Sequence, residues 1–196
     1  MVNSRLCWSV NKHNLLSPIQ CGGRKGHSTQ DHLVRVSTYI QEGLVKKQHI
    51  VGILFDLEKG YDKTWRSVIL NVLHEWGLRG NLPKFIKKYL RLRTFQVRCG
   101  QQLSPIMEQE NGVQQGSSIA GTLFNIAVNT VNESLPRELL SCLFIDDLGI
   151  FYRGPSLALI ETKLNATLKA LDSWSQSYGF TFSVDKTVAI HFCRKR

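Results

Sequence analysis

Two adjacent carboxylates interrupt an apolar stretch in the last third of the chain. Asp146 and Asp147 stand between Leu143–Ile145 and Leu148–Ile150, two short apolar runs that each predict a strand. Burying a charge is costly unless the charge is paired or bound to a metal. The pair therefore indicates either a metal-binding tip of a hairpin or an ordinary exposed turn, where Asp is favoured.

A third carboxylate, Asp56, ends another apolar run, Ile50–Phe55. If these strands are neighbours in one sheet, Asp56 and Asp146 meet at the same end. Three converging carboxylates repel each other unless divalent cations neutralise them, and Mg²⁺ binds carboxylate oxygens, water and phosphates. Two such ions about 3.5–4 Å apart can hold both oxygens of an in-line phosphoryl displacement. The three acids therefore predict a two-metal site for phosphoryl transfer.

The elements that would position these acids follow from apolar spacing and from turn residues. Ser28–Asp31 resembles a capping box and should open a helix to about Lys47. One face of this helix should carry Leu33, Val36 or Val34, Ile40 and Leu44. A helix from Trp65 to Trp76 should end at Gly77. We further expect helices at 81–90, from Ser117 or Ser118 to about 132, and from 157 to Gly179; a hairpin over 94–108; and strands at 139–145, 148–152, 180–183 and 187–192.

The core of this order is strand, helices, strand, hairpin return, helix, strand. It predicts an α+β fold, the βαββαβ unit, with an antiparallel sheet and helices on one face. In this unit the first strand and the hairpin lie side by side in the middle of the sheet. RNA-recognition modules share the order, so the fold alone does not settle the function.

Composition narrows the classes of partner and compartment. Lys and Arg outnumber Asp and Glu by 25 to 15 over 196 residues, which favours a polyanionic partner such as nucleic acid over a merely basic protein. Five scattered cysteines without a C-x-x-C pair favour a reducing compartment and argue against a disulfide framework or zinc finger. Neither a secretory leader nor an apolar stretch of about 18 residues is present, so we expect an intracellular protein without membrane spans.

Two basic groups are candidates for contact with nucleic acid. The first group has aromatic residues interleaved with its basic ones, which are Lys84, Lys87, Lys88, Arg91 and Arg93. This mixture suits a surface that follows a nucleic-acid strand, although a solvated helix face is the commoner explanation. The second group is the run 194–196.

Five stretches occur in the order typical of one enzyme family. They resemble the reverse transcriptase motifs of LINE-type (non-LTR) retrotransposons, with Gly23, Gly60 and Gln114 departing from the usual Phe, Ala and Pro. The stretches are Gln20–Thr29 (QCGGRKGHST), Phe55–Asp62 (FDLEKGYD), Gly112–Ser117 (GVQQGS), Phe144–Asp147 (FIDD), and Gly179-Phe180 followed by Lys186-Thr187.

The resemblance implies a polymerase palm with part of the fingers. Residues 1–48 would be a partial fingers segment with a helix, and residues 49–196 the palm. The family's upstream R-P-I-S-L segment does not precede residue 20, and the thumb would lie beyond residue 196. We therefore expect a piece of a larger polymerase, truncated at both ends. It would transfer dNTPs to the 3′-hydroxyl of a DNA primer on an RNA template, with two Mg²⁺ or Mn²⁺ ions.

The resemblance also implies roles for the acids and for one aromatic residue. Asp56, Asp146 and Asp147 would hold the metals, and the backbone carbonyl of Leu57 would add a ligand. Tyr61 would lie under the sugar and reject a ribose 2′-hydroxyl. The alternative for Tyr61 is an ordinary core aromatic.

The remaining implied roles each have a plain alternative. Gln115 and Gly116 would pack on the incoming nucleotide and the template base, or form a simple turn. Lys186 would protonate pyrophosphate or bind its charge, or be a solvated turn lysine. Arg24 and Lys25 would contact template phosphates, or belong to an exposed basic loop.

Two other functions remain open from the sequence. One is an inactive retrotransposon remnant that folds and at most binds RNA, although such a protein has no reason to keep three acids. The other is a different palm nucleotidyl transferase, such as a cyclase, against which Gly112–Ser117 and the Arg24 segment argue.

Overall fold

A four-stranded antiparallel sheet forms the centre of the computed structural model, which describes residues 1–193. The strands are β1 (His49–Asp56), β6 (Leu140–Phe144), β7 (Asp147–Gly154) and β8 (Val188–Phe192), in the order β6-β7-β1-β8. This is the predicted βαββαβ topology. β1 and β7 are the two central strands, as expected, whereas β6, the other strand of the hairpin, lies at an edge rather than in the middle. The basic run 194–196 lies outside the described residues.

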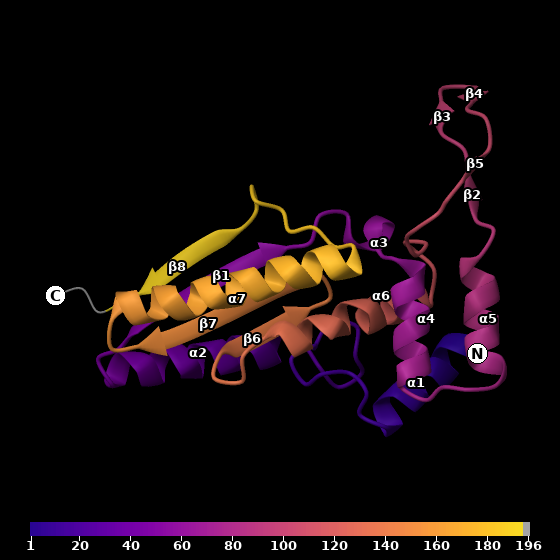
Figure 1. Cartoon of the computed structure of the whole chain (residues 1–196). Coiled ribbons are helices and arrows are strands. Elements are labelled where there is room, and N and C mark those ends of the chain that lie inside the picture. The colour runs from indigo at the N-terminus through magenta and orange to yellow at the C-terminus, as the bar shows by residue number, and fades with distance from the viewer. Residues whose placement is uncertain (194–196) are drawn as a thin grey trace.

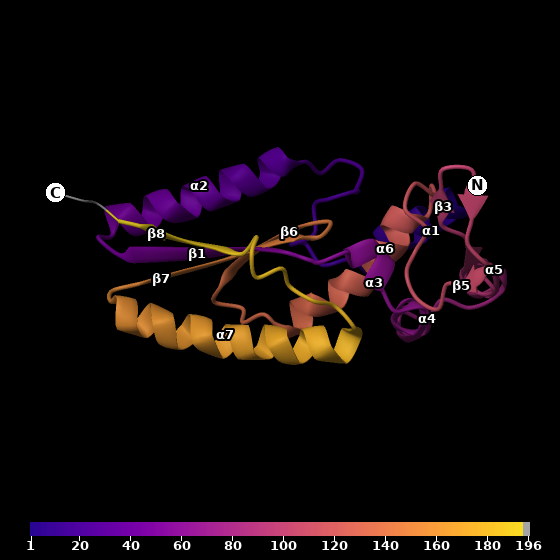
Figure 2. The same cartoon turned by 90° about the horizontal axis from the view of Figure 1, so that it is seen from above.

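Helices cover both faces of this sheet. Figure 2 shows α7 (Leu157–Tyr178) along one face and α2 (Thr29–Val45) along the other. α2 precedes β1 and is therefore an addition to the βαββαβ unit. α6 (Ala120–Val128) lies between the sheet and α4 (Arg66–Glu75), as Figure 1 shows.

A second group of helices lies at one end of the sheet (Figure 1). It contains α1 (Val2–Lys12), α4 and α5 (Asn81–Leu90). α4 and α5 match the predicted helices, but α1 was not predicted. Its buried residues Leu6 and Val10 are four apart and face the core, while polar neighbours hide this period in the sequence.

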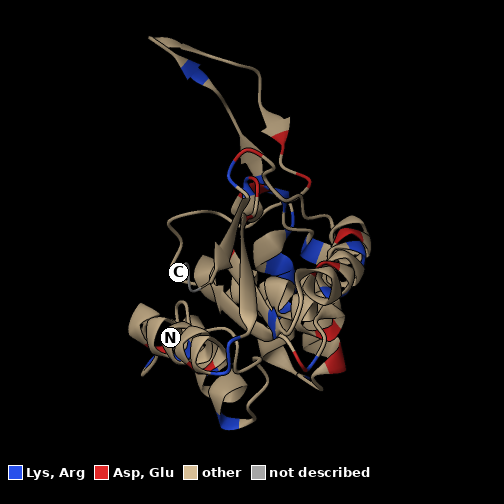
Figure 3. Cartoon of the chain, turned by 90° about the vertical axis from the view of Figure 1, so that its left-hand side faces the viewer, with Lys and Arg blue, Asp and Glu red and all other residues tan. Residues whose placement is uncertain are grey.

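The hairpin expected over 94–108 projects away from the rest of the molecule (Figure 1). It consists of two short antiparallel ladders whose paired residues are all exposed. Figure 3 shows that basic segments are spread over several elements and that this projection carries few charges. The strands are β2 (Thr94–Phe95), β3 (Arg98–Cys99), β4 (Gln102–Leu103) and β5 (Met107–Glu108).

α2 begins as predicted, and its predicted apolar face lies only partly against the sheet. The amide of Ser28 donates to Asp31 Oδ2 at 2.7 Å, as a capping box requires. Of the apolar residues expected on one face, Leu33 is 67% exposed, whereas Val36, Ile40 and Leu44 are half-buried. The helix approaches β1 through Gly43, where an added Cβ would lie 2.8 Å from Ile50 Cγ1. His32, three turns earlier on the same face, is the other buried residue of α2.

α6 begins later than the sequence predicted. Its N-cap is Ile119 and no side chain caps it, so the expected serine cap was wrong. The Ser117 hydroxyl is engaged elsewhere, since it accepts a hydrogen bond from the Tyr89 hydroxyl at 2.7 Å. The helix also stops at Val128 and continues as a 3₁₀ helix, η1 (Asn129–Ser134).

The core lies between the sheet, α6 and α7. Leu123, Phe124 and Ile126 of α6 are fully buried. Trp174 of α7 stacks on Phe180 with ring centroids 5.0 Å apart, and its indole N–H donates to Thr130 Oγ1 at 2.9 Å. Among residues 1–193, no helix is both long enough and apolar enough to cross a bilayer.

Two glycines with the same backbone angle give a matched test of this packing. Gly179 ends α7 and Gly77 follows α4, both with φ of 74°. A Cβ on Gly179 would lie 2.1 Å from Trp65 Cε2, whereas a Cβ on Gly77 would meet nothing within 4 Å. We expect Gly179→Ala to lower the free energy of unfolding by roughly 2–4 kcal/mol and Gly77→Ala by only about 1 kcal/mol. Equal losses in urea titrations would contradict the predicted contact with Trp65.

Candidate active site

Three carboxylates converge at one end of the central strands. Asp56 is the last residue of β1 and lies directly across from Asp147, the first residue of β7. Asp146 belongs to the two-residue turn Ile145–Asp146 between β6 and β7. Residues 90 positions apart in sequence therefore meet, as the sequence analysis expected of Asp56 and Asp146.

Asp56 and Asp146 share one polar cavity of about 420 Å³. Asp147 lines a different, apolar cavity on the α2 side of the sheet, together with Leu33 and Phe144. The two carboxylates at the turn therefore line different cavities, Asp146 the polar one and Asp147 the apolar one. The lining of the polar cavity is Asp56, Leu57, Glu58, Lys59, Gly60, Tyr61, Asp62, Gln115, Asp146, Ser183 and Lys186.

Negative charge exceeds positive charge around the three acids. Lys186 Nζ donates to Asp56 Oδ2 at 3.0 Å, and this hydrogen bond raises the pKa of Lys186. The pKa of Asp147 is raised by partial burial, then by the charges of Asp146 and Asp56, while Lys186 opposes the rise. Asp147 is exposed, and Lys186 offsets only part of the negative charge around it.

Lys186 reaches Asp56 because the chain runs back along the end of β1. The amide of Ser183 donates to the Asp56 carbonyl at 2.9 Å, and the amide of Glu58 donates to the Thr181 carbonyl at 2.8 Å. The strand expected over 180–183 is thereby reduced to one bridge, between Leu57 and Phe182. Ser183 also lines the polar cavity, although nothing in its sequence context marked it as a site residue.

Tyr61 combines a packing role with a place in the cavity wall. It lies in α3 (Gly60–Lys63) and stacks on Phe124, with ring centroids 4.5 Å apart and planes 12° from parallel. Its pKa is raised by burial and then by the charge of Asp146, which places the hydroxyl within the field of that carboxylate. Gly60 allows this packing, since an added Cβ would lie 3.0 Å from the Phe124 ring.

The loop before α6 is fastened to α3. The amide of Gly112 donates to the Thr64 carbonyl at 2.8 Å, and the amide of Val113 donates to the Tyr61 carbonyl at 2.9 Å. Gly112 has φ of 88°, and a Cβ there would lie 2.6 Å from the Asp62 carbonyl oxygen. These contacts place the exposed Gln115 in the cavity wall, whereas Gly116 next to it does not line the cavity.

Arg66 also holds this loop, and the sequence analysis did not single it out. Its guanidinium donates to the carbonyl of Gln109 at 2.6 Å and to that of Gly112 at 2.9 Å. A basic residue at the start of an amphipathic helix is common, so its type and position carry no signal without the fold.

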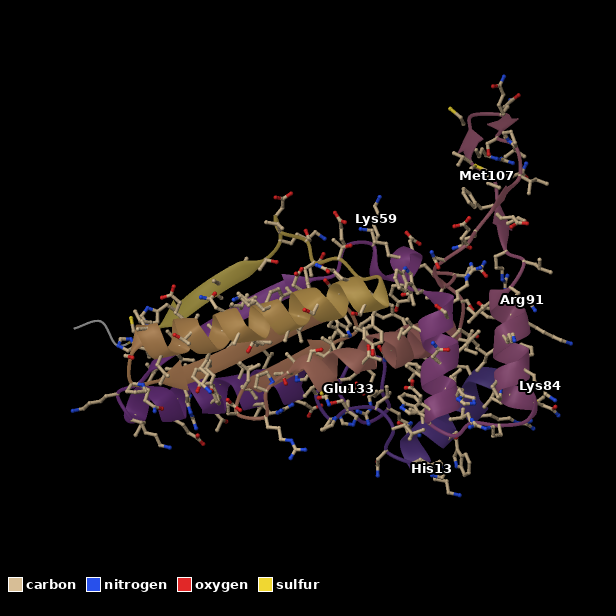
Figure 4. All side chains as sticks on the ribbon, viewed as in Figure 1. His13, Lys59, Lys84, Arg91, Met107 and Glu133 are labelled. Carbon is tan, nitrogen blue, oxygen red and sulfur yellow. The ribbon has the colours of Figure 1, made fainter. Side chains whose placement is uncertain are left out.

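Arg24 and Lys25 do not line the cavity. Arg24 Nη1 donates to the carbonyls of Ser17 at 3.1 Å and Gln20 at 3.0 Å, so its guanidinium braces its own segment. Lys25 is exposed. Figure 4 shows Lys59 on the loop after β1, and farther away Lys84 on α5 and Arg91 just after the end of α5.

The chain matches known proteins over nearly its whole length. The family model described as reverse transcriptase (RNA-dependent DNA polymerase) matches residues 1–195. The RNA-directed DNA polymerase from the mobile element jockey of Drosophila melanogaster is 22% identical over 100% of this chain and 22% of its own length. The jockey polymerase of Drosophila funebris is 24% identical over 98% of this chain and 22% of its own length. The chain thus spans about a fifth of these relatives.

Solved structures with the same fold include yeast telomerases. Apo telomerase from Candida tropicalis, truncated from its C-terminal domain, superposes with a TM-score of 0.70 at 17% identity, over 97% of this chain and 39% of that one. A Candida tropicalis telomerase in complex with a fragment of telomeric RNA gives 0.72 at 16% identity, over 97% and 33%. Together with the family match over residues 1–195, this fold places the chain in the reverse transcriptase family, with relatives among the polymerases of non-LTR retrotransposons.

Proposed function

We propose that this chain is the catalytic palm region, with part of the fingers, of an RNA-directed DNA polymerase. It would join dNTPs to a primer 3′-hydroxyl on an RNA template. The observation that carries the proposal is the placement of Asp56 and Asp146 on one polar cavity, with Asp147 beside them. Residues 49–196 would form the palm, and residues 1–48 would contribute to the fingers.

The acids present fit a pair of divalent cations. Carboxylate and carbonyl oxygens are the ligands that Mg²⁺ and Mn²⁺ favour, and the pKa of Asp147 is raised by partial burial and then by the negative charges of Asp146 and Asp56. Asp56, Asp146, Asp147 and the Leu57 carbonyl would hold the ions. When bound, they would supply activation of the primer hydroxyl and stabilisation of the leaving pyrophosphate.

Lys186 would change partners when the site is loaded. In the structure its ammonium occupies Asp56 Oδ2, an oxygen that a cation would also need. The lysine side chain is 67% exposed and free to turn, so it would move to the pyrophosphate charge. Beside Asp56, the hydrogen bond to that carboxylate raises the pKa of Lys186 and favours the protonated ammonium.

The nucleotide would lie against Tyr61 and the loop that carries Gln115. Tyr61 is held rigidly by its stacking on Phe124, so its ring is suited to a fixed steric limit under the sugar. Gln115 and Gly116 would contact the nucleotide and template base.

Replacing Tyr61 by Ala should relax the exclusion of ribonucleotides in an incorporation assay. If the exclusion of ribonucleotides is unchanged, Tyr61 is a packing residue only.

Nucleic acid would be attracted by the net charge of +10, and Arg24 and Lys25 would contribute near the template. Arg24 Nη1 already donates to two backbone carbonyls and its Nε is buried, so contact with phosphate would use Nη2. The resemblance to a telomerase solved with RNA supports an RNA template.

The direct test is incorporation of dNTPs on a poly(rA)/oligo(dT) template by the chain joined to fingers and thumb segments of a related polymerase. We expect Mg²⁺-dependent synthesis that falls by on the order of 10²–10³ in Asp146→Asn, because charge stabilisation at the reacting phosphate is lost. Asp172→Asn on α7, which removes an exposed carboxylate far from the cavity, should leave it unchanged. Metal-independent RNA binding without synthesis, equal in both variants, would instead support the inactive remnant.

Charge repulsion predicts that the Asp147 carboxylate, which the proposed function needs, lowers the stability of the metal-free fold. Because the folded state raises the pKa of Asp147, stability declines as pH rises from the unfolded pKa through the folded one. We expect Asp147→Asn to stabilise the metal-free chain at pH 7 by less than about 1 kcal/mol, since Asp147 is partly screened by solvent. The difference should shrink as pH falls toward 4. Thermal unfolding with and without Mg²⁺ measures this, and a variant less stable than wild type without metal would contradict it.

A further inference from the structure

We propose that Gln20 and Asn125 are positioning residues for the catalytic turn: two buried amides that hold the backbone of Ile145 and thereby fix the direction of the Asp146 carboxylate. The effect on the metal site rests on the proposed function, whereas the hydrogen bonds of Gln20 and Asn125 do not depend on it. No role was assigned to either side chain from the sequence.

The turn that carries Asp146 is conformationally strained. Ile145 has φ of 60° and is the first residue of the two-residue turn between β6 and β7. Such turns favour Gly where φ is positive. A β-branched residue is strained in this region and persists there only when its surroundings fix it. Something outside the hairpin must therefore hold Ile145.

The Gln20 side chain supplies that restraint. Its Oε1 accepts the Ile145 amide at 3.0 Å, and its Nε2 donates to the Ile145 carbonyl at 3.3 Å. Both backbone polar groups of the strained residue are thus bound by one side chain. Gln20 has 0% exposure, so water cannot substitute for these bonds without opening the structure.

The Gln20 amide is itself oriented by a second amide. Its Nε2 also donates to Asn125 Oδ1 at 3.3 Å, and Asn125 Nδ2 donates to the Gly22 carbonyl at 2.8 Å. Gln20 Oε1 accepts the Gly22 amide at 2.8 Å as well. Asn125 is 2% exposed. A closed set of satisfied hydrogen bonds in a buried place fixes one arrangement rather than several.

The backbone around Gln20 is built to bring the amide to the turn. The Leu143 amide donates to the Ile19 carbonyl at 2.8 Å, and the Cys21 amide donates to the Leu143 carbonyl at 2.9 Å, so this segment runs beside β6. Gly22 lies against the turn, because an added Cβ would be 2.5 Å from the Ile145 amide nitrogen. Only glycine permits this approach.

The restraint acts on Asp146 through the main chain. Asp146 directly follows Ile145, so a change in the Ile145 backbone would redirect its carboxylate away from Asp56. Asn125 lies on α6, the helix that follows the Gln115 loop, so the same amides tie that helix to the acids. Partners that orient metal ligands typically change metal affinity or activity by about 10–100-fold when removed.

The test uses the chain of residues 1–196 and Mn²⁺ as the probe, followed by electron paramagnetic resonance titration. Gln20→Met keeps the side-chain length but removes the hydrogen bonds. Thr130→Val is the matched control, since it removes the buried hydrogen bonds of Thr130 with Trp174 and Ala127, away from the turn. We expect Gln20→Met to weaken Mn²⁺ binding by about tenfold or more, and Thr130→Val to leave it unchanged at a similar loss of stability.

A second single variant separates positioning from general stability. Asn125→Leu keeps the hydrogen bonds of Gln20 to the Ile145 amide and carbonyl and removes the side chain that orients the Gln20 amide. We expect Asn125→Leu to weaken Mn²⁺ binding less than Gln20→Met does at a similar loss of stability. If Mn²⁺ affinity simply follows stability across Gln20→Met, Asn125→Leu and Thr130→Val, the amides are structural only and the inference is overturned.

Hydrogen exchange at the Ile145 amide keeps this test independent of the proposed function. Faster exchange at Ile145 in Gln20→Met, but not in Thr130→Val, supports the restraint, and unchanged exchange overturns it. Wild type that binds no Mn²⁺ would overturn the proposed function while leaving this readout intact. Wild type and Gln20→Met that bind Mn²⁺ equally would overturn the inference and leave the proposed function standing.

Discussion

The repulsion among Asp56, Asp146 and Asp147 is the constraint on which the other features of the site depend. Their proximity follows from a single register, in which β1 and β7 pair from His49–Gly154 to Asp56–Asp147. A slip of one residue would turn Asp56 to the other face of the sheet. The register is secured by close packing within the pair, since a Cβ on Gly52 would lie 2.6 Å from the Phe151 ring.

The surrounding structure holds charges together that would separate if left free. Lys186 neutralises part of the cluster, and Gln20 fixes the strained residue before Asp146. Each of these side chains fixes one local arrangement that adds little to the stability of the fold, as is typical of sites arranged for a ligand. The pKa of Asp147 is raised by burial and then by the charges of Asp146 and Asp56, a combination that is common at functional sites.

The strand order and the meeting of the acids could be predicted, because apolar runs and the βαββαβ unit determine which strand ends are neighbours. Local polarity hid the rest. α1 was missed because only Leu6 and Val10 mark its buried face, and α2 turns Leu33 outward because Gly43 sets its contact with the sheet. The partner of Gln20 lies 105 residues away in sequence, a relation that no local pattern carries.

The central claim is that the acids form a pocket for a pair of divalent ions. The most direct measurement is anomalous diffraction from crystals of the chain soaked in Mn²⁺. If the acids hold a pair of ions, two anomalous peaks should appear about 3.5–4 Å apart between the carboxylates of Asp56 and Asp146. Peaks only at other places on the molecule, or none at saturating Mn²⁺, would contradict it.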